Sequence, residues 1–179
     1  MHIGHLAMAD EARAQFGYDI VVLVPSLHPP HKSLAEDPGP GHRLAMLRLA
    51  VEGESAMAVD DCEIRRGGTS YTIDTIRDLV ARMGPEGKPG LLLGDDLIPG
   101  FPSWREPEAL VREADLVCAR RSSAVRLDLA YPHVYADNIP IPVSSSMVRA
   151  RAASGRPFRW YIPGPVYRYI RERKLYGCG

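Results

Sequence analysis

Long apolar runs are missing from the 179-residue chain, and none comes near the roughly 20 residues that a membrane-spanning helix requires. The N-terminus has neither the basic region nor the apolar stretch of a signal peptide. Cysteine is scarce, and Cys62, Cys118 and Cys178 are too widely spaced for a disulfide framework or a paired-cysteine metal site. These absences argue against a membrane protein and a disulfide-stapled secreted domain, and we expect a cytoplasmic protein.

A net charge is missing as well, because 22 basic residues balance 22 acidic residues. Strong non-specific attraction to nucleic acid or to an anionic membrane is therefore not expected, and local sites must provide the specificity. The length is typical of one domain with a continuous core. We predict a single domain over residues 1–179, with a C-terminal helical part from about residue 144 to 179. The sequence does not predict an oligomeric state.

Helical and apolar stretches alternate along the chain. Apolar residues at helical spacing predict a first helix from Ile3 to Phe16, with Gly17 as its stop. Short apolar runs predict strands at 19–25, 57–64, 90–96, 115–120 and 133–137. Further helices are predicted at 42–52, 70–84 with Ser70 or Thr72 as cap, 104–114, 144–155 and 164–177. This alternation predicts a Rossmann-like, doubly wound parallel α/β sheet whose ligands bind at the carboxyl ends of the strands.

The first residues, MHIGHL, place His2, Gly4 and His5 on the first turn of the predicted helix. Backbone N–H groups without partners and the positive end of the helix dipole favour an anion there, so the two imidazoles predict a phosphate site. One alternative is a frayed, solvated terminus. Another is a zinc site completed by His28 and His31, but no carboxylate or thiolate lies at ligand spacing nearby.

The segment SSSMVR, from Ser144 to Arg149, opens a later predicted helix with three hydroxyl groups. A helix cap accounts for one of these serines. Three hydroxyls followed by a guanidinium group exceed what a cap needs, and they suit the outer phosphates of a nucleotide.

These two motifs together resemble the nucleotidyltransferase superfamily, whose members transfer an adenylyl group from ATP. Five other segments narrow the resemblance to the bacterial nicotinate-nucleotide adenylyltransferases. They are VPSLHPPHK (24–32), RGGTSYTIDTI (66–76), LLLGDDL (91–97), FPSWREP (101–107) and VYRYIRERKLYG (166–177). The resemblance implies adenylyl transfer from ATP to nicotinate mononucleotide in NAD biosynthesis. Mg²⁺ would accompany ATP, and the products would be deamido-NAD and pyrophosphate.

The resemblance also implies roles for individual residues. Catalysis would fall to His2, His5 and Arg149, and ATP binding to these residues with Gly4, Ser144, Ser145 and Ser146. The acceptor nucleotide would contact His31, Lys32, Tyr71, Thr72, Asp96, Trp104 and Arg105. Trp104 would stack on the pyridinium ring, with a core tryptophan as the alternative, and Thr72 would bind the nicotinate carboxylate or only cap its helix. The role of Asp95 stays open, and no protein residue is assigned to a metal.

The chain departs from this family at its beginning. Family members start with a strand and a loop of the type GG(S/T)FDP before the HxGH motif, and neither precedes His2 here. That strand lies in the middle of the family's sheet, so we predict a natural start upstream. The alternatives are a related adenylyltransferase acting on nicotinamide mononucleotide or phosphopantetheine, and an inactive relative that still binds nucleotide. A class I aminoacyl-tRNA synthetase is set aside, because no KMSKS-like segment or basic tRNA surface is present.

Overall fold

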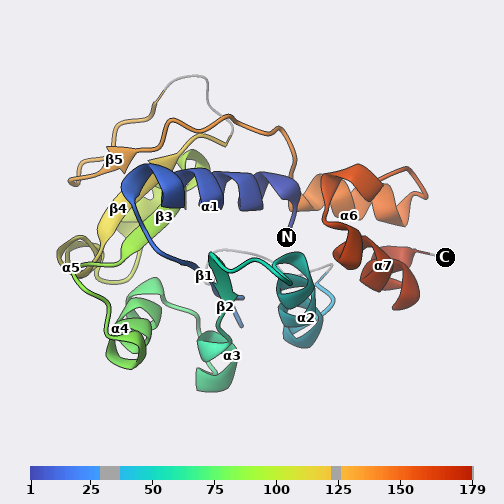
Figure 1. The fold of residues 1–179 in the computed structure, drawn as a ribbon, viewed down its shortest axis with the longest axis horizontal. Helices are drawn as coiled ribbons and strands as arrows, with labels where there is room; N and C mark the ends of the chain where they lie inside the picture. Colours follow the sequence, from blue (N-terminus) through green and yellow to red (C-terminus); the bar gives the residue numbers. More distant parts are fainter. Residues whose placement is uncertain (29–36, 122–125, 179) are drawn as a thin grey trace.

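The computed structural model describes residues 1–28, 37–121 and 126–178, and its strands alternate with helices (Figure 1). The α-helices have the bounds α1 Ile3–Phe16, α2 Pro40–Ala50, α3 Cys62–Arg66, α4 Thr72–Met83, α5 Pro107–Glu113, α6 Ser145–Ala153 and α7 Gly164–Glu172. Three 3₁₀ segments complete the helical structure, η1 Asp95–Ser103, η2 Arg159–Tyr161 and η3 Leu175–Gly177.

The strands are parallel throughout the described chain. β1 (Val21–Leu23) pairs with β2 (Met57–Val59), while β3 (Gly90–Gly94) pairs with β4 (Asp115–Ala119), which in turn pairs with β5 (Val134–Tyr135). The parallel α/β class is therefore confirmed. The strands nevertheless form two sheets, because no hydrogen-bonded ladder joins β1 to β3 among the described residues.

Helix α1 connects the two sheets by packing against both β1 and β4 (Figure 1). Its buried Ala12 lies in a cluster with Val117, Ala119 and Ala136. The small alanine side chains let the helix approach the strands closely, and Gly17, at φ 72°, ends the helix in the left-handed conformation that glycine tolerates best. Because His2 and His5 lie at the other end of α1, this packing positions the histidine pair.

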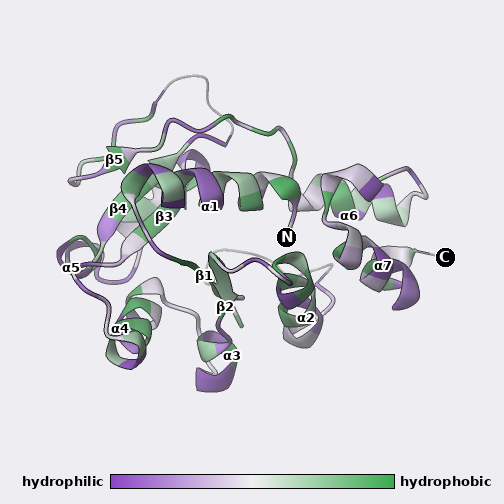
Figure 2. Ribbon diagram, in the orientation of Figure 1, coloured by the Kyte–Doolittle hydropathy of each residue, from purple (hydrophilic) through white to green (hydrophobic). Residues whose placement is uncertain are grey.

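Apolar side chains form two large clusters. The first surrounds Leu93 and Phe101 and joins the β3–β4 sheet to α4, α5 and η1. The second surrounds Val148 and Val166 and joins α2, α6 and α7. Hydrophilic residues mark α3 and the outer part of α7 (Figure 2). In the described chain, no helix combines the length and the apolar character needed to cross a membrane.

Three predicted elements end earlier in the structure than the sequence indicates. The run at 57–64 is a strand only to Val59 and then becomes α3, whose first residue is held by a hydrogen bond from the Cys62 N–H to the Asp60 carboxylate. The strand at 90–96 ends at Gly94, where η1 begins. The last helix stops at Glu172, and Lys174 and Tyr176 turn the chain with positive φ angles before it ends in η3.

The predicted caps of α4 are wrong. Tyr71 occupies the cap position and provides no side-chain hydrogen bond. The Ser70 hydroxyl is engaged elsewhere, because it accepts hydrogen bonds from the N–H groups of Leu27 and His28 at 2.9 and 3.3 Å. Ser70 therefore ties the end of β1 to the start of α4, a long-range contact that local sequence cannot indicate.

Candidate active site

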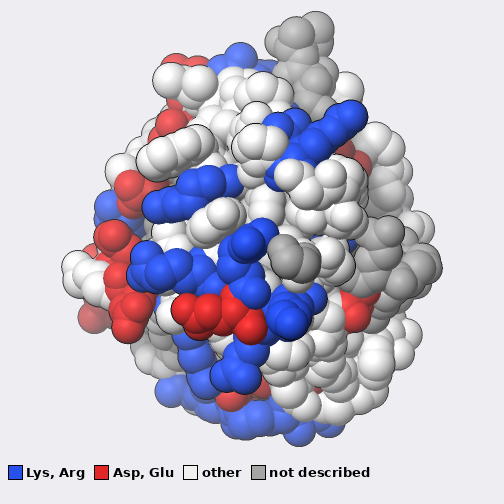
Figure 3. All heavy atoms as spheres, turned by 90° about the vertical axis from the view of Figure 1, so that its right-hand side faces the viewer, with Lys and Arg blue, Asp and Glu red and all other residues white. Residues whose placement is uncertain are grey.

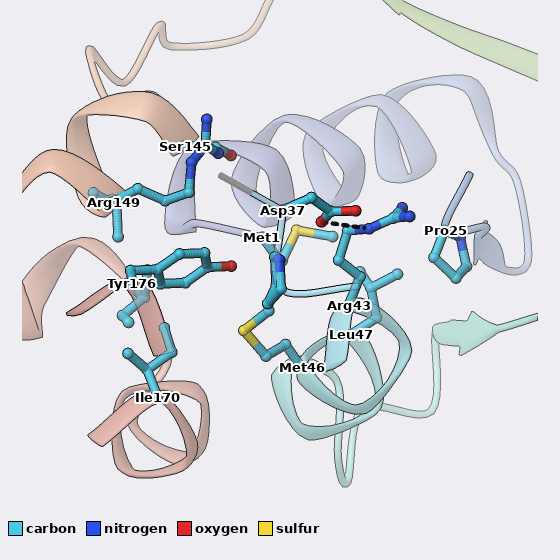
Figure 4. A pocket seen from close by; sticks show the side chains of 13 residues that line it. Met1, Pro25, Asp37, Arg43, Met46, Leu47, Ser145, Arg149, Ile170 and Tyr176 are labelled. Atoms are coloured by element: carbon cyan, nitrogen blue, oxygen red, sulfur yellow. Dashed lines mark ion pairs between the residues drawn. The ribbon is translucent and has the colours of Figure 1, made fainter. Parts of the chain in front are cut away.

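A pocket of about 270 Å³ lies where the N-terminus meets α2, α6 and α7 (Figure 4). Its polar lining comes from Asp37, Arg43, Ser145, Arg149 and Tyr176. Its apolar lining includes Met1, Met46, Leu47, Val148 and Ile170. The pocket therefore combines charged groups suited to phosphate with an apolar wall suited to a flat organic ring.

The two histidines of the HIGH motif lie side by side at the start of α1. His2 is the cap residue of the helix and is only 1% exposed. The His2 and His5 rings stack with their centroids 3.7 Å apart. Neither ring nitrogen of His2 has a hydrogen-bond partner among the described residues, which is costly for a buried polar group. An anion at this helix end would supply the missing partner.

Burial lowers the pKa of His2 to about 4, with smaller contributions from the Met1 amino group and Arg121. His2 is therefore neutral near pH 7 and can donate one N–H without carrying charge. Burial and Arg149 also lower the pKa of the Met1 amino group. Arg43 and Arg149 are the two arginines that line the pocket and can supply positive charge to a polyphosphate.

Gly4 is required by close packing rather than by backbone angles. A Cβ atom at this position would lie 3.2 Å from Nδ1 of His2 and 3.3 Å from the carbonyl oxygen of Ile141. A side chain would therefore press on the imidazole that the motif presents. This contact explains the glycine between the two histidines in physical terms.

The N-terminus of α6 brings the serine motif to the same place. The Ser144 hydroxyl accepts a hydrogen bond from the Met147 N–H at 3.1 Å, which confirms a serine cap. Ser145 and Arg149 line the pocket, and Nη2 of Arg149 donates to the Ser146 hydroxyl at 3.4 Å. Met1, which directly precedes the HIGH motif, lines it as well, whereas His2, Gly4 and His5 are not among its lining residues (Figure 4).

The predicted acceptor residues that the structure describes, Tyr71, Thr72, Asp96, Trp104 and Arg105, lie outside the lining of this pocket. The Arg105 guanidinium lies 4.6 Å from the centre of the Tyr71 ring and 3.7 Å from the Asp74 carboxylate. Trp104 is half-buried, with its ring centroid 5.3 Å from that of Phe101. Thr72 is the first residue of α4. The structure thus brings Tyr71, Thr72 and Arg105 together, and Trp104 belongs partly to the core.

The two aspartates after β3 have different environments. Asp95 is buried and accepts a hydrogen bond from the Arg121 N–H at 3.0 Å, so it holds the end of β4 beside the end of β3. Asp96 forms an ion pair with the Arg121 guanidinium at 3.0 Å. Sequence reasoning did not single out Arg121, although an arginine directly after the strand predicted at 115–120 could have indicated it.

Arg43 was also missed. Its guanidinium donates to the carbonyl oxygens of Ser26 and Leu27 and forms an ion pair with Asp37 at 3.0 Å. The arginine near the start of a helix that follows a proline-rich loop was the available signal. His31 and Lys32 lie outside the residues that the structure describes.

One group of ligand-type side chains within the described ranges is compact enough for a metal, namely Asp60, Cys62 and Asp78. Arg82 already pairs with both carboxylates, at 2.9 and 3.1 Å. Burial and Asp60 raise the pKa of the Cys62 thiol to about 12, so the thiolate that a metal needs is disfavoured. The group does not include His2, His5 or His28, so the zinc alternative gains no support.

Known proteins similar to this chain share its whole length. The cytidylyltransferase-like family model matches residues 1–151. A Borrelia garinii subsp. bavariensis protein named probable nicotinate-nucleotide adenylyltransferase is 40% identical over 176 residues, which cover 98% of this chain and 89% of the relative. A Treponema pallidum (strain Nichols) protein of the same name is 33% identical over 190 residues, covering 98% and 93%.

Solved structures show the same fold. Plasmodium falciparum nicotinic acid mononucleotide adenylyltransferase complexed with NaAD has a TM-score of 0.78 at 21% identity, covering 100% of this chain and 93% of that one. The same enzyme complexed with APC has a TM-score of 0.74 at 20% identity, covering 100% and 92%. With a family model over residues 1–151 and relatives along nearly its full length, the chain belongs to the cytidylyltransferase-like family and, within it, to the nicotinate-nucleotide adenylyltransferases.

Proposed function

We propose that this protein transfers the adenylyl group of ATP to nicotinate mononucleotide, giving deamido-NAD and pyrophosphate in NAD biosynthesis. The observation that carries the proposal is a pocket lined by Met1, directly before the α1 N-terminus with its buried His2, and by Ser145 and Arg149 of α6. Helix N-termini and guanidinium groups favour the phosphates of a nucleotide. Relatives at up to 40% identity that bear the name of this activity support it.

In this reaction a phosphate oxygen of the acceptor attacks the α-phosphorus of ATP. The bond from the α-phosphorus to its bridging oxygen breaks, and pyrophosphate leaves with the electron pair. No protein nucleophile is required, so the protein acts by aligning the two nucleotides and by offsetting the charge that develops on the phosphates.

The donor side of the site holds the triphosphate. His2 and His5 donate to the phosphates, with His5 nearer the transferred group, and the close approach at Gly4 keeps the imidazole pair in place. Ser144, Ser145 and Ser146 supply hydroxyl and backbone donors, and Arg149 supplies charge for the outer phosphates. Because His2 is neutral near pH 7, it orients phosphate oxygens through hydrogen bonds. Arg149 supplies most of the positive charge that stabilises the phosphates on this side.

The acceptor side holds the mononucleotide. Arg105, placed over Tyr71 at the start of α4, receives the nicotinate carboxylate together with the backbone donors near Thr72. Trp104 offers the exposed part of its ring to the pyridinium. His31 and Lys32 bind the acceptor phosphate. Asp96 accepts from a ribose hydroxyl, for which it must share its carboxylate with Arg121.

Mg²⁺ fits this site as a companion of ATP rather than as a metal bound by the protein alone. Asp37 is the single carboxylate lining the described pocket, and Arg43 pairs with it. Mg²⁺ prefers several oxygen ligands and is often held by one or two carboxylates together with substrate phosphates. When bound, it would offset negative charge on the triphosphate.

The test is pyrophosphate release from Mg·ATP with nicotinate mononucleotide, nicotinamide mononucleotide or phosphopantetheine as acceptor. We expect release with nicotinate mononucleotide and formation of deamido-NAD. Fast release with either other acceptor and none with nicotinate mononucleotide would move the assignment to that acceptor. ATP binding by folded protein without release in any mixture would identify a relative that has lost catalysis.

A further inference from the structure

The zero net charge of the chain conceals a strong separation of charge. Residues 144–178 contain eight of the 22 basic residues and, at Glu172, one of the 22 acidic residues. This segment therefore has a formal charge of +7, and the rest of the chain has −7. The space-filling view of the α6–α7 end shows basic side chains spread over much of that face (Figure 3).

The basic residues of the two parts also differ in how they are paired. Within the described ranges, every ion pair uses an arginine between Arg13 and Arg121. Arg156, Arg168 and Lys174 are exposed and form no ion pair with a described residue. Their charge is therefore not offset locally, and it contributes to the field around this end of the molecule.

This basic face is the outer side of the layer that forms the nucleotide pocket. On its inner side, Ser145 and Arg149 of α6, Ile170 of α7 and Tyr176 of η3 line the pocket (Figure 4). Arg168 and Lys174 lie on the same short stretch as Ile170 and Tyr176. Each cation is thus two residues along the chain from a lining residue, which keeps it near the cavity on the scale of the Debye length of about 8 Å at physiological salt.

We propose that the basic face formed by Arg156, Arg168, Lys174 and their neighbours on α6 and α7 draws anionic nucleotides toward the pocket by long-range electrostatic attraction. This inference rests on the proposed function. ATP and nicotinate mononucleotide are both anions, so a positive potential at this end raises their local concentration beside the site. Residues that never touch the substrate thus contribute to its affinity at low salt and lose that effect at high salt.

The test compares two double variants that change the charge of the protein equally. Arg168→Glu with Lys174→Glu reverses two exposed cations on the basic face. Arg112→Glu with Lys88→Glu reverses two exposed cations, also without ion pairs among the described residues, near α5 at the opposite end of the molecule (Figure 1). The Kd of Mg·ATP is measured by titration calorimetry at low and at high salt, together with KM and kcat for the full reaction.

For the variant of the basic face, we expect the Kd of Mg·ATP to rise about fivefold at low salt. At about 0.5 M salt, where exposed charges are largely screened, the Kd should approach the wild-type value. The kcat value should not change. The control variant should bind nearly as the wild type does at both salt levels.

Equal effects of the two variants, or an effect that persists at high salt, would overturn the electrostatic proposal. Salt-sensitive binding of Mg·ATP in a wild-type protein that transfers nothing to nicotinate mononucleotide would instead contradict the proposed function alone. The binding measurement therefore separates the two failures.

Discussion

At the scale of single residues, His5 is the sharpest test of catalysis. It stacks on His2 at the start of α1, and in the proposed reaction it donates to the transferred adenylyl group. We expect His5→Ala to lower kcat on the order of a hundredfold or more, as removal of a transition-state donor does. His133→Ala, at a histidine beside Tyr131 and Tyr135, serves as the control and should stay near wild-type activity. A decrease of only a few-fold in His5→Ala would refute the role.

The protonation of His2 makes the stability of the folded protein depend on pH. Because its pKa falls from 6.5 to about 4 in the folded protein, the unfolded chain binds the proton more readily, and stability is lost as the pH falls below 6.5. Between pH 7 and pH 5 this histidine should lower the free energy of unfolding by about 2 kcal/mol. Urea unfolding at both values, for wild type and His2→Asn, measures the difference. An equal pH dependence in both proteins would contradict a buried, neutral His2.

At the scale of secondary-structure elements, the serines at the start of α6 have two different roles, helix capping and contact with Arg149. Ser144 caps the helix, whereas Ser146 is paired with Arg149. Ser144→Ala should lower the free energy of unfolding by about 1 kcal/mol, while Ser146→Ala should leave stability nearly unchanged. Ser146→Ala should instead raise KM for ATP. Chemical unfolding of both variants measures the loss of stability, and steady-state kinetics measures KM for ATP. Equal losses of stability would show that the two hydroxyls do not have different roles.

Element positions followed well from the sequence, since amphipathic or apolar periodicity predicted α1, α2, α4 and most strands. The wrong prediction of the α4 cap has a long-range cause. Ser70 binds backbone groups of residues 27 and 28, so it does not cap α4. At the site, the HIGH and SSSMVR motifs could be singled out because their residue types show their chemistry locally, and Ser145 and Arg149 of the second motif do line the pocket. The sequence could not identify Arg43 and Arg121 in the same way, because their carbonyl and carboxylate partners come close only in the folded chain.

At the scale of the whole molecule, the division into two parallel sheets is the main feature. β1 and β3 each have an edge that pairs with no described strand, and both sheets pack on α1. Unpaired backbone groups at strand edges are unfavourable when they are removed from water. That the chain forms a single domain over residues 1–179 stays a prediction, as does its cytoplasmic location.

A version extended at the N-terminus by one apolar strand and a glycine-rich loop tests whether these edges need a partner. We expect a higher Tm by several degrees, because a central strand would satisfy both edges and join the two sheets. An extension of equal length rich in glycine and serine is the control. No gain of the strand-bearing version over this control would show that the two sheets do not require a shared strand.

The contacts of Arg43 have a further consequence for how α2 is anchored to the residues that follow β1. The guanidinium donates to the carbonyl oxygens of Ser26 and Leu27 and pairs with the carboxylate of Asp37. One side chain therefore holds residues 26 and 27 close to residue 37. A single half-buried cation thereby couples the position of the residues after β1 to the start of α2, so a displacement of either one is transmitted to the other.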